Sequence, residues 1–540
     1  MRLHARAREA TEWALTAASA PTMAPDELDV DAVITGPDGG VVRAPAFWAG
    51  GVEWRVRFAP PAAGEYRWRS ECPAAAGSGL HGVEGALMVG EPASQSALLA
   101  RGPLRVAADR RHLEHADGTP FFWLADTWWM GLCKRWRWPE DFRAMVADRT
   151  AKGFTVIQIV AGMYPDMDAF DPRGENEAGF PWDAEWRVRP EYYDSADLRI
   201  QWLARCGLVP CIVGCWGYYI HRLGVERMKR HWRNLVARYH AYPVVWCLAG
   251  EVLMPYYLEP LPDDVARERH VGEMRAMWNE VGAYVRSIDP VGHPVTAHPS
   301  TAARDSLDDA VLDFDMLQTG HGDRTSLPNT VKQVVRSYSR APAMPVINGE
   351  VCYEGIGEAS RQEVQRLMFW VCMLSGACGH TYGANGIWQI NETGRPYGPS
   401  PHGMSWGDTP WEEAARLPGS EQVGLGKRLL ERYRWWEFAP RQAWVEPRAT
   451  PENPMAPFAA GIAGQVRVVF TPSYVPIRKV LGMEPGVTYR AFFWDPKNGA
   501  ERDLGEARAD SAGSWACPQL PIFQDWVLVL EAPGARVKSA

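Results

Sequence analysis

The pattern of hydrophobic and polar positions in the middle of the chain, from about residue 104 to 440, alternates apolar runs with helical periods. Between the fourth and fifth runs, for example, Val271, Met274 and Val281 recur at helical spacing. A doubly wound open sheet is the alternative, but it calls for a glycine-rich phosphate loop after an early strand, and the sequence has none. The pattern predicts an α/β fold of the (β/α)8 TIM-barrel type. Its eight strand runs lie at 121–126, 154–160, 208–214, 244–249, 294–298, 313–318, 344–349 and 377–382.

Both ends of the chain alternate apolar and polar residues instead. From Val52 to Phe58 the apolar side chains fall on one face and charged ones on the other, which is typical of a half-buried strand. After about residue 440 similar segments are broken by the turn signal Pro-Lys-Asn-Gly. We therefore expect a β-sandwich over 1–100, a barrel over 104–440 and a second β-sandwich over 441–540.

Composition narrows the classes of partner. Hydrophobic residues make up 46% of the chain and charged residues 23%, as in globular proteins. The net charge of −8 comes without a basic stripe, which argues against nucleic acids and anionic membranes as partners. No apolar run reaches the roughly 18 residues of a membrane span. The ten cysteines form no CxxC pair and are interpreted as reduced, buried thiols.

The first residues of the sequence carry charges with no apolar stretch behind them. This pattern differs from that of a secretory signal and predicts a cytoplasmic protein. An exported protein whose signal has been removed would show the same pattern.

Two glutamates directly follow predicted strands on opposite sides of the barrel. Glu251 comes after the fourth strand and Glu350 after the seventh. Active sites of TIM barrels lie at the C-terminal ends of the strands, so both carboxyl groups can flank one scissile bond. Glycoside cleavage with retention needs one protonated carboxyl group to assist the leaving oxygen and one ionised group to attack the anomeric carbon. The pair predicts a retaining glycoside hydrolase.

The neighbours of the two glutamates favour a division of roles. Apolar residues around Glu251 would desolvate it and raise its pKa, whereas the polar flank of Glu350 leaves room for hydrogen bonds that keep it charged. Either glutamate alone could instead be a solvated loop residue or an ion-pair partner. Glu354 is the rival of Glu350 for the role of nucleophile.

Further polar and aromatic residues near strand ends are candidate sugar contacts. A carboxylate at Asp126 can bind two hydroxyl groups, although an aspartate there can also cap a helix. Indole rings suit stacking on the C–H face of a sugar. The histidines are unrelated singles in sequence, so we predict no metal site and no cofactor. The expected contacts are Asp126, Trp128, Trp129, Trp216, His298, His321, Tyr382 and Trp388.

Several segments carry a resemblance to one family. LEHADGTPFFWLADTWW (113–129) resembles the opening strand of the apiosidase-like glycoside hydrolases, and the stretch 400–440, which ends in RLLERYRWWEFAP, resembles the close of their catalytic domain. FWAGGVEWRVRFAPPAAGEYRW resembles the sandwich often attached before that domain, and FFWDPKNGAERDLGE with DWVLVLEA resembles a collagen-binding-type C-terminal domain. The resemblance covers nearly the whole chain.

The resemblance implies Glu251 as acid/base and Glu350 as nucleophile. Two positions depart from the wider clan of retaining barrel glycosidases. Its usual Asn before the acid/base is Gly250 here, and its usual Tyr at the sixth strand is replaced by a segment that offers Gln318 or His321. Contacts around the sugar ring therefore differ from those of common pyranosidases.

We expect an exo-acting enzyme on plant-type side-chain sugars, such as apiose or other furanosides and pentosides. Two alternatives stay open. A non-catalytic carbohydrate-binding protein could share the fold, but it would need no acid/base pair. An inverting hydrolase could use Glu251 with Asp126 or Glu354, with carboxyl groups about 6.5–9.5 Å apart instead of about 5–5.5 Å.

Overall fold

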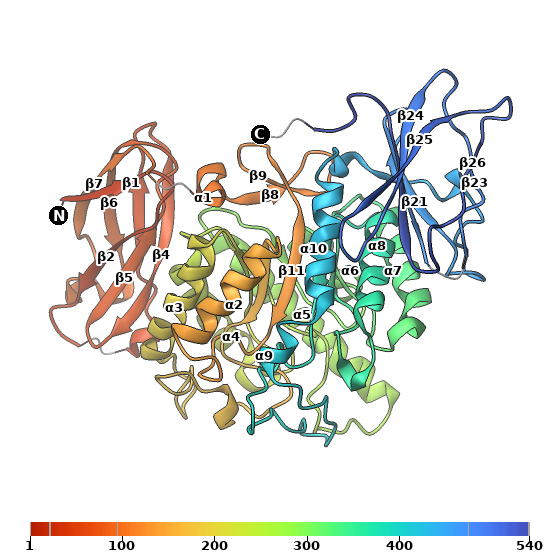
Figure 1. Ribbon diagram of the computed structural model, residues 1–540. Helices are drawn as coiled ribbons and strands as arrows, with labels where there is room; N and C mark the ends of the chain where they lie inside the picture. The colour runs from red at the N-terminus through yellow and green to blue at the C-terminus, as the bar shows by residue number, and fades with distance from the viewer. Residues whose placement is uncertain (1, 21–22, 94–95, 473–474, 538–540) are drawn as a thin grey trace.

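The computed structural model describes residues 2–20, 23–93, 96–472 and 475–537, which form a central barrel flanked by two β-sheet domains (Figure 1). The N-terminal domain is a seven-stranded sheet of order β1-β7-β6-β3-β4-β5-β2. Its strands are β1 (Arg2–Arg6), β2 (Thr11–Thr16), β3 (Asp31–Thr35), β4 (Val41–Gly50), β5 (Glu53–Phe58), β6 (Gly64–Glu71) and β7 (Glu84–Gly90).

Strand β4 joins the two halves of this sheet. Its first residues pair with β3 and its later residues with β5, so the sheet folds over a core that includes Trp13, Trp54 and Trp68. The charged face of β5 is only partly open to solvent. Arg57 is buried and donates to Asp197 and to the carbonyl oxygen of Arg238, both in the barrel. This face holds the N-terminal domain against the barrel.

A short connection leads into the barrel. It consists of helix α1 (Ala97–Arg101) and a three-stranded sheet of β8 (Leu104–Val106), β9 (Leu113–His115) and β10 (Pro120–Phe121).

The central domain is a parallel eight-stranded barrel, as the sequence predicts, with strand order β15-β14-β13-β12-β11-β18-β17-β16. Each predicted apolar run overlaps one of its strands. Between β15 and β16 the backbone N–H of Asp313 donates to the carbonyl oxygen of Val295 at 2.8 Å, which links the two ends of the sheet. The strands are β11 (Trp123–Trp128), β12 (Val156–Val160), β13 (Val209–Val213), β14 (Val245–Cys247), β15 (Val295–Thr296), β16 (Asp315–Gln318), β17 (Val346–Glu350) and β18 (Gly379–Tyr382).

Helices surround the barrel because both faces of a parallel sheet must be covered (Figure 1). Within the described residues, no helix combines the length and the apolar run that a bilayer crossing needs. The helices are α2 (Glu140–Ala151), α3 (Pro190–Arg205), α4 (Tyr219–Tyr239), α5 (Asp264–Ile288), α6 (Ala303–Ser306), α7 (Leu327–Ser339), α8 (Gln362–Leu374), α9 (Trp411–Ala414) and α10 (Pro418–Leu430).

The C-terminal domain consists of a six-stranded sheet, of order β19-β21-β22-β27-β24-β25, and a three-stranded sheet, of order β20-β23-β26. Their strands are β19 (Ala439–Pro440), β20 (Val445–Glu446), β21 (Phe458–Ile462), β22 (Val466–Thr471), β23 (Lys479–Val480), β24 (Thr488–Trp494), β25 (Glu501–Arg508), β26 (Trp515–Ala516) and β27 (Trp526–Glu531).

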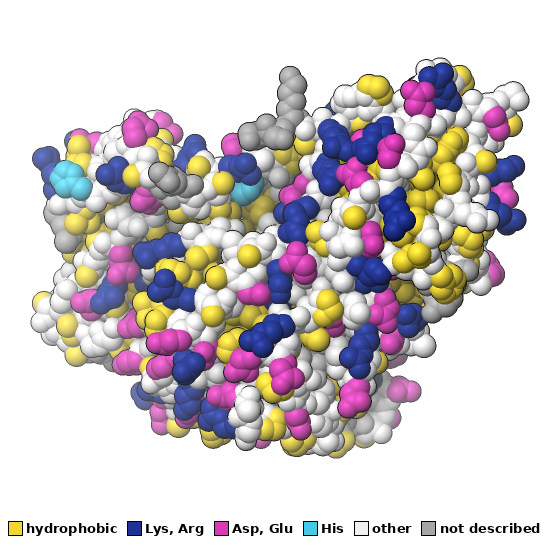
Figure 2. Space-filling view, in the orientation of Figure 1, with side chains coloured by type: hydrophobic (Ala, Val, Ile, Leu, Met, Phe, Trp, Pro, Cys, Tyr) yellow, Lys and Arg dark blue, Asp and Glu magenta, His cyan; other side chains and the backbone are white. Residues whose placement is uncertain are grey.

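One face of the larger sheet packs on the outer side of α8. The ring of Trp370 lies with its centroid 6.1 Å from that of Phe470 and 5.9 Å from that of Trp494. The guanidinium of Arg366 also donates to the carboxylate of Asp525. Because the sheet covers α8, this helix is buried from Val364 to its end. On the face shown in Figure 2, acidic and basic side chains are interspersed over the barrel and the C-terminal domain.

Candidate active site

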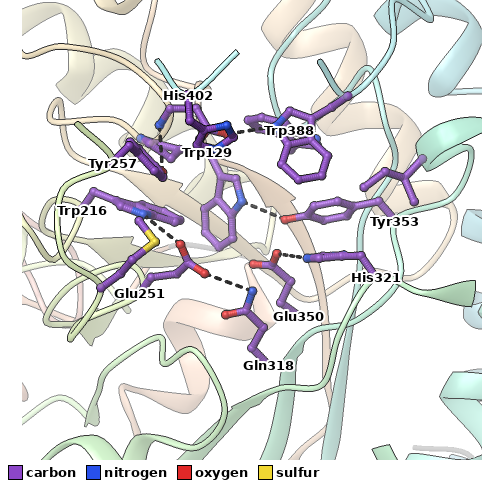
Figure 3. Close-up of a pocket in the computed structure, with 15 residues that line it drawn as sticks. Trp129, Trp216, Glu251, Tyr257, Gln318, His321, Glu350, Tyr353, Trp388 and His402 are labelled. Carbon is purple, nitrogen blue, oxygen red and sulfur yellow. Dashed lines mark hydrogen bonds and ion pairs between the residues drawn. The ribbon is translucent and has the colours of Figure 1, made fainter. Parts of the chain in front are cut away.

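A pocket of about 240 Å³ opens at the C-terminal ends of the barrel strands (Figure 3). Its lining comes from the ends of β16 and β17 and from the loops after β11, β12, β13, β14, β16, β17 and β18. It includes both glutamates that the sequence singled out. The lining residues are Trp129, Pro165, Asp166, Trp216, Glu251, Met254, Tyr257, Gln318, His321, Glu350, Tyr353, Ile356, Trp388, His402 and Trp406.

Glu350 is the last residue of β17 and is 5% exposed. Nε2 of His298 lies 2.9 Å from its Oε2, and Nε2 of His321 lies 2.8 Å from its Oε1. Burial alone would raise the pKa of Glu350, but the two imidazoles outweigh it and hold the pKa well below its usual range. In turn, contact with this carboxylate raises the pKa of His321, although burial opposes the rise. Glu350 is therefore an ionised carboxylate.

Glu251 lies in the loop after β14 and has the opposite environment. The indole N–H of Trp216 donates to its Oε2 at 3.3 Å, and the side-chain amide of Gln318 donates to its Oε1 at 3.3 Å. Burial, and then the charge of Glu350, raise the pKa of Glu251 to about 7, against the opposing influence of His298. Near neutral pH a large share of this carboxyl group carries its proton.

The backbone at Glu251 is in the left-handed region, with φ of 41°. Only a few per cent of residues other than glycine adopt positive φ, and such backbone costs energy that the surrounding structure must supply. Gly217 N–H donates to the carbonyl oxygen of Gly250 at 2.7 Å, and Gly250 N–H donates to that of Cys215 at 2.8 Å. These two bonds fix the chain just before the glutamate.

Gly250 is required by its neighbour Trp216. A Cβ atom at residue 250 would lie 2.2 Å from two carbon atoms of the Trp216 ring. The indole therefore occupies the space that the usual Asn side chain of the wider clan would need. The two replacements at the sixth strand both reach the site: His321 contacts Glu350, and Gln318 contacts Glu251.

Aromatic rings form one wall of the pocket (Figure 3). The indole N–H of Trp129 donates to the hydroxyl of Tyr353 at 2.9 Å. The Tyr353 ring stacks between two others, with its centroid 4.9 Å from His321 and 6.2 Å from Trp388. Fixed aromatic faces beside a carboxylate pair suit a sugar ring, which presents polarised C–H groups to a π-system.

Comparison with known families identifies the chain. The model of the family described as "Apiosidase-like, catalytic domain" matches residues 107–437, which is more than half of the chain. The chain belongs to the apiosidase-like family. This membership makes the protein a glycosidase, and it favours an enzyme over a non-catalytic carbohydrate-binding protein. A second family model, a domain of unknown function called DUF5060, matches residues 9–73 in the N-terminal sheet.

Solved structures similar to this apiosidase-like protein share its fold. A structure titled "Glycoside hydrolase" is 23% identical, covers 81% of this chain and 98% of its own, and has a TM-score of 0.66. A glycoside hydrolase family 5 protein from Bacteroides vulgatus ATCC 8482 is 22% identical, covers 80% and 94%, and has the same TM-score of 0.66. A third structure, from the same bacterium, is 14% identical but covers 98% of this chain and all of its own, with a TM-score of 0.69. No curated protein matches the chain.

Four predicted sugar contacts of the apiosidase-like protein, His298 among them, lie outside the pocket lining. Three of these four make buried contacts elsewhere, and those three predictions are wrong. Asp126 is 0% exposed, and its Oδ2 accepts from Arg149 at 2.6 Å and from the indole of Trp128 at 2.8 Å. Trp128 itself packs in a T-shaped contact against Trp136. Tyr382 donates its hydroxyl hydrogen to Glu354 at 2.6 Å. These side chains belong to buried contacts that hold the barrel together.

The other predicted residues come together at the site. Trp129, Trp216, His321 and Trp388 line the pocket with the two glutamates. His298 is buried outside the lining, where it contacts the carboxylate of Glu350 and packs against the rings of Trp129 and Trp216. Glu354 is held by Tyr382 and by the backbone N–H of Gly419, away from the lining. Neither of the second carboxyl groups considered for inversion, Asp126 or Glu354, therefore reaches the pocket.

Sequence reasoning missed Asp166, which is 8% exposed and lines the pocket from the loop after β12. Burial raises its pKa, and the side chains of Tyr257 and Trp406 oppose the rise. Its position in the loop after the second strand, at the active-site end of the barrel, is the sequence feature that could have identified Asp166. Tyr257, His402 and Trp406 come from long loops without a period and gave no such signal. Among the residues that the structure describes, no three His, Cys, Asp or Glu side chains converge as a metal site would require.

Proposed function

We propose that the protein is a retaining glycosidase in which Glu350 is the nucleophile and Glu251 the acid/base. The observation that supports this most strongly is the contrast between two carboxyl groups in one pocket. The environment of Glu251 raises its pKa to about 7, whereas that of Glu350 lowers its pKa. Titratable pairs whose environments separate their pKa values in this way divide into an acid and an ionised partner.

The proposed reaction has two steps. The Glu350 carboxylate attacks the anomeric carbon while the bond to the leaving oxygen breaks, and Glu251 transfers its proton to that oxygen. Glu251 is then ionised and takes a proton from water. The resulting hydroxide attacks the same carbon, breaks the ester bond to Glu350 and releases the sugar with its original configuration. His298 and His321 stabilise Glu350 each time it returns to the charged form.

The size of the pocket supports action on a terminal sugar. A volume of about 240 Å³ lies below the roughly 300–1,000 Å³ of sites for drug-sized ligands, so the cavity has room for one sugar ring. Together with the family, this favours exo cleavage of a plant-type side-chain glycoside, with an apiose-like furanose or another pentose as the released sugar.

A screen of aryl glycosides of pentoses and hexoses in both ring forms tests the proposal. NMR of the first product decides the stereochemistry, and we expect the anomer of the substrate. Glu350→Gln should abolish turnover of every glycoside because no glycosyl ester can form, and added azide should restore part of it. A variant that keeps most of its rate, or an inverted first product, would rule out the proposed nucleophile.

A further inference from the structure

Asp166 is the third carboxyl group of the pocket, and the two-glutamate mechanism does not use it. We propose that Asp166 is a specificity-determining residue that accepts hydrogen bonds from hydroxyl groups of the sugar held between Glu251 and Glu350. It would select neutral, hydroxyl-bearing sugars over acidic ones. This inference rests on the proposed function, since it assigns the sugar to that same cavity.

The contacts of Asp166 hold its carboxyl group in place. The indole N–H of Trp406 donates to Oδ2 at 3.2 Å, and the backbone N–H of Asp166 donates to the hydroxyl of Tyr257 at 3.3 Å. Both partners also line the pocket, and they come from the loops after β18 and β14. A carboxylate has about four lone-pair sites, so the indole leaves acceptor capacity for a ligand. A fixed acceptor of this kind discriminates between hydroxyl patterns more sharply than a mobile one.

The small volume of the pocket places Asp166 on the same ring as the glutamates. A cavity of about 240 Å³ holds one ring, and Asp166, Glu251 and Glu350 all line it. A sugar whose anomeric carbon lies between the glutamates therefore presents its remaining hydroxyl groups to the rest of the lining. Asp166 is the remaining carboxyl group among the described lining residues.

The charged side chains of the pocket lining disfavour sugars that carry a negative charge. The described lining contains three carboxyl groups and no Lys or Arg. Of the two lining histidines, His321 is already engaged by Glu350, and Nδ1 of His402 lies 2.8 Å from the hydroxyl of Ser400. A uronic acid or a sulfated sugar would therefore bring an anion into a site without a Lys or Arg partner, which costs far more than burying a hydrogen-bonded hydroxyl group.

The test compares Asp166→Asn and Asp166→Ala with the wild type on the best neutral sugar of the aryl glycoside screen. Each enzyme is assayed on the 4-nitrophenyl glycoside and on the methyl glycoside of that sugar. Loss of a hydrogen bond to a charged group corresponds to a roughly 10- to 150-fold fall in kcat/KM. We expect that fall to be the same for both leaving groups, because Asp166 contacts the sugar and not the departing oxygen. The wild type should also prefer 4-nitrophenyl glucoside and galactoside to the matching glucuronide and galacturonide, and Asp166→Asn should narrow that preference.

Asp168→Asn is the matched control. Asp168 lies two residues along the same loop, where it accepts from Tyr256, pairs with Arg222 at 3.8 Å and does not line the pocket. Its activity should stay at the wild-type level, and thermal melting should show all variants folded.

Three results would overturn the inference. One is an Asp166→Asn variant within about threefold of the wild type on both leaving groups, where a lost charged hydrogen bond predicts roughly tenfold or more. Another is a loss confined to the methyl glycoside, which would make Asp166 part of proton donation. The third is a wild-type preference for the uronides. Failure of the proposed function gives a different pattern, because it appears as activity retained in Glu350→Gln whatever Asp166→Asn does.

Discussion

Removal of the proposed acid gives the sharpest prediction, because its effect depends on the leaving group. In Glu251→Ala the departing oxygen receives no proton from the enzyme. General acid assistance contributes roughly 10²–10⁴-fold, so we expect kcat/KM on methyl glycosides to fall by that factor. A 4-nitrophenolate leaves without a proton, so its glycosides should lose far less in the first step. Deglycosylation should then become limiting, with a glycosyl-enzyme intermediate that mass spectrometry can detect.

The structure sets the size of the pH effect. With a pKa of about 7, roughly half of the Glu251 carboxyl groups are protonated at pH 7. At the ordinary value of 4.5, only about 0.3% would be, so its buried site supplies about 150 times more of the acid form. The acid must be protonated to act. Wild-type kcat/KM should therefore fall as the pH rises through about 7, and this limb should be absent in Glu251→Ala.

A pH series of kcat/KM on paired methyl and 4-nitrophenyl glycosides makes the measurement. Glu259→Ala is the control, since Glu259 lies in the same loop after β14 but is exposed and outside the pocket lining. Equal losses on both leaving groups, with the high-pH limb unchanged, would refute the assignment of Glu251 as the acid.

Four further predictions concern the surroundings of the site and the C-terminal domain. Gly250→Asn should lose nearly all activity while circular dichroism shows a folded protein. The new Cβ atom would lie 2.2 Å from ring atoms of Trp216 and would displace this indole, which donates a hydrogen bond to Glu251. A variant with wild-type kcat would contradict this. Gln318→Met removes the hydrogen bond that lowers the pKa of Glu251. The fall of kcat/KM at high pH should therefore move to higher pH. A move to lower pH would contradict the inferred effect of Gln318. Asp525→Ala leaves the buried Arg366 without its carboxylate, which should lower the stability by about 3 kcal/mol in a denaturant titration with kcat unchanged. Removal of the residues after 440 should lower the solubility of the protein more than its kcat, because the truncation exposes the apolar ring of Trp370.

The barrel and its two glutamates were predictable because each depends on local pattern. Apolar runs marked all eight strands, and a glutamate directly after a run must lie at the end of the barrel where such strands finish. The error at the first strand came from its end point. The run was taken to end at Asp126, but β11 continues to Trp128. Asp126 and Trp128 therefore lie inside the strand on the face toward α2, and the next residue, Trp129, enters the pocket.

The remaining parts of the site depend on contacts between distant segments. Asp166 lies six residues beyond the end of β12, and Trp406 lies in the long loop after β18. Nothing in either segment alone shows that the indole donates to that carboxylate. The burial of Arg57 on the polar face of β5 is another example, because its partner Asp197 belongs to a barrel helix. Alternation predicts a face, and only the assembled domains show what covers it.

The left-handed backbone at Glu251 makes this residue a point where activity and robustness compete. A side chain other than glycine at such a φ costs about 1–3 kcal/mol, and a glycine would relieve most of it. Selection for thermal stability alone should therefore favour glycine at position 251 and yield a more stable but inactive protein. Directed evolution of this protein needs an activity screen at every round, because the most stable variants at this position are expected to be inactive.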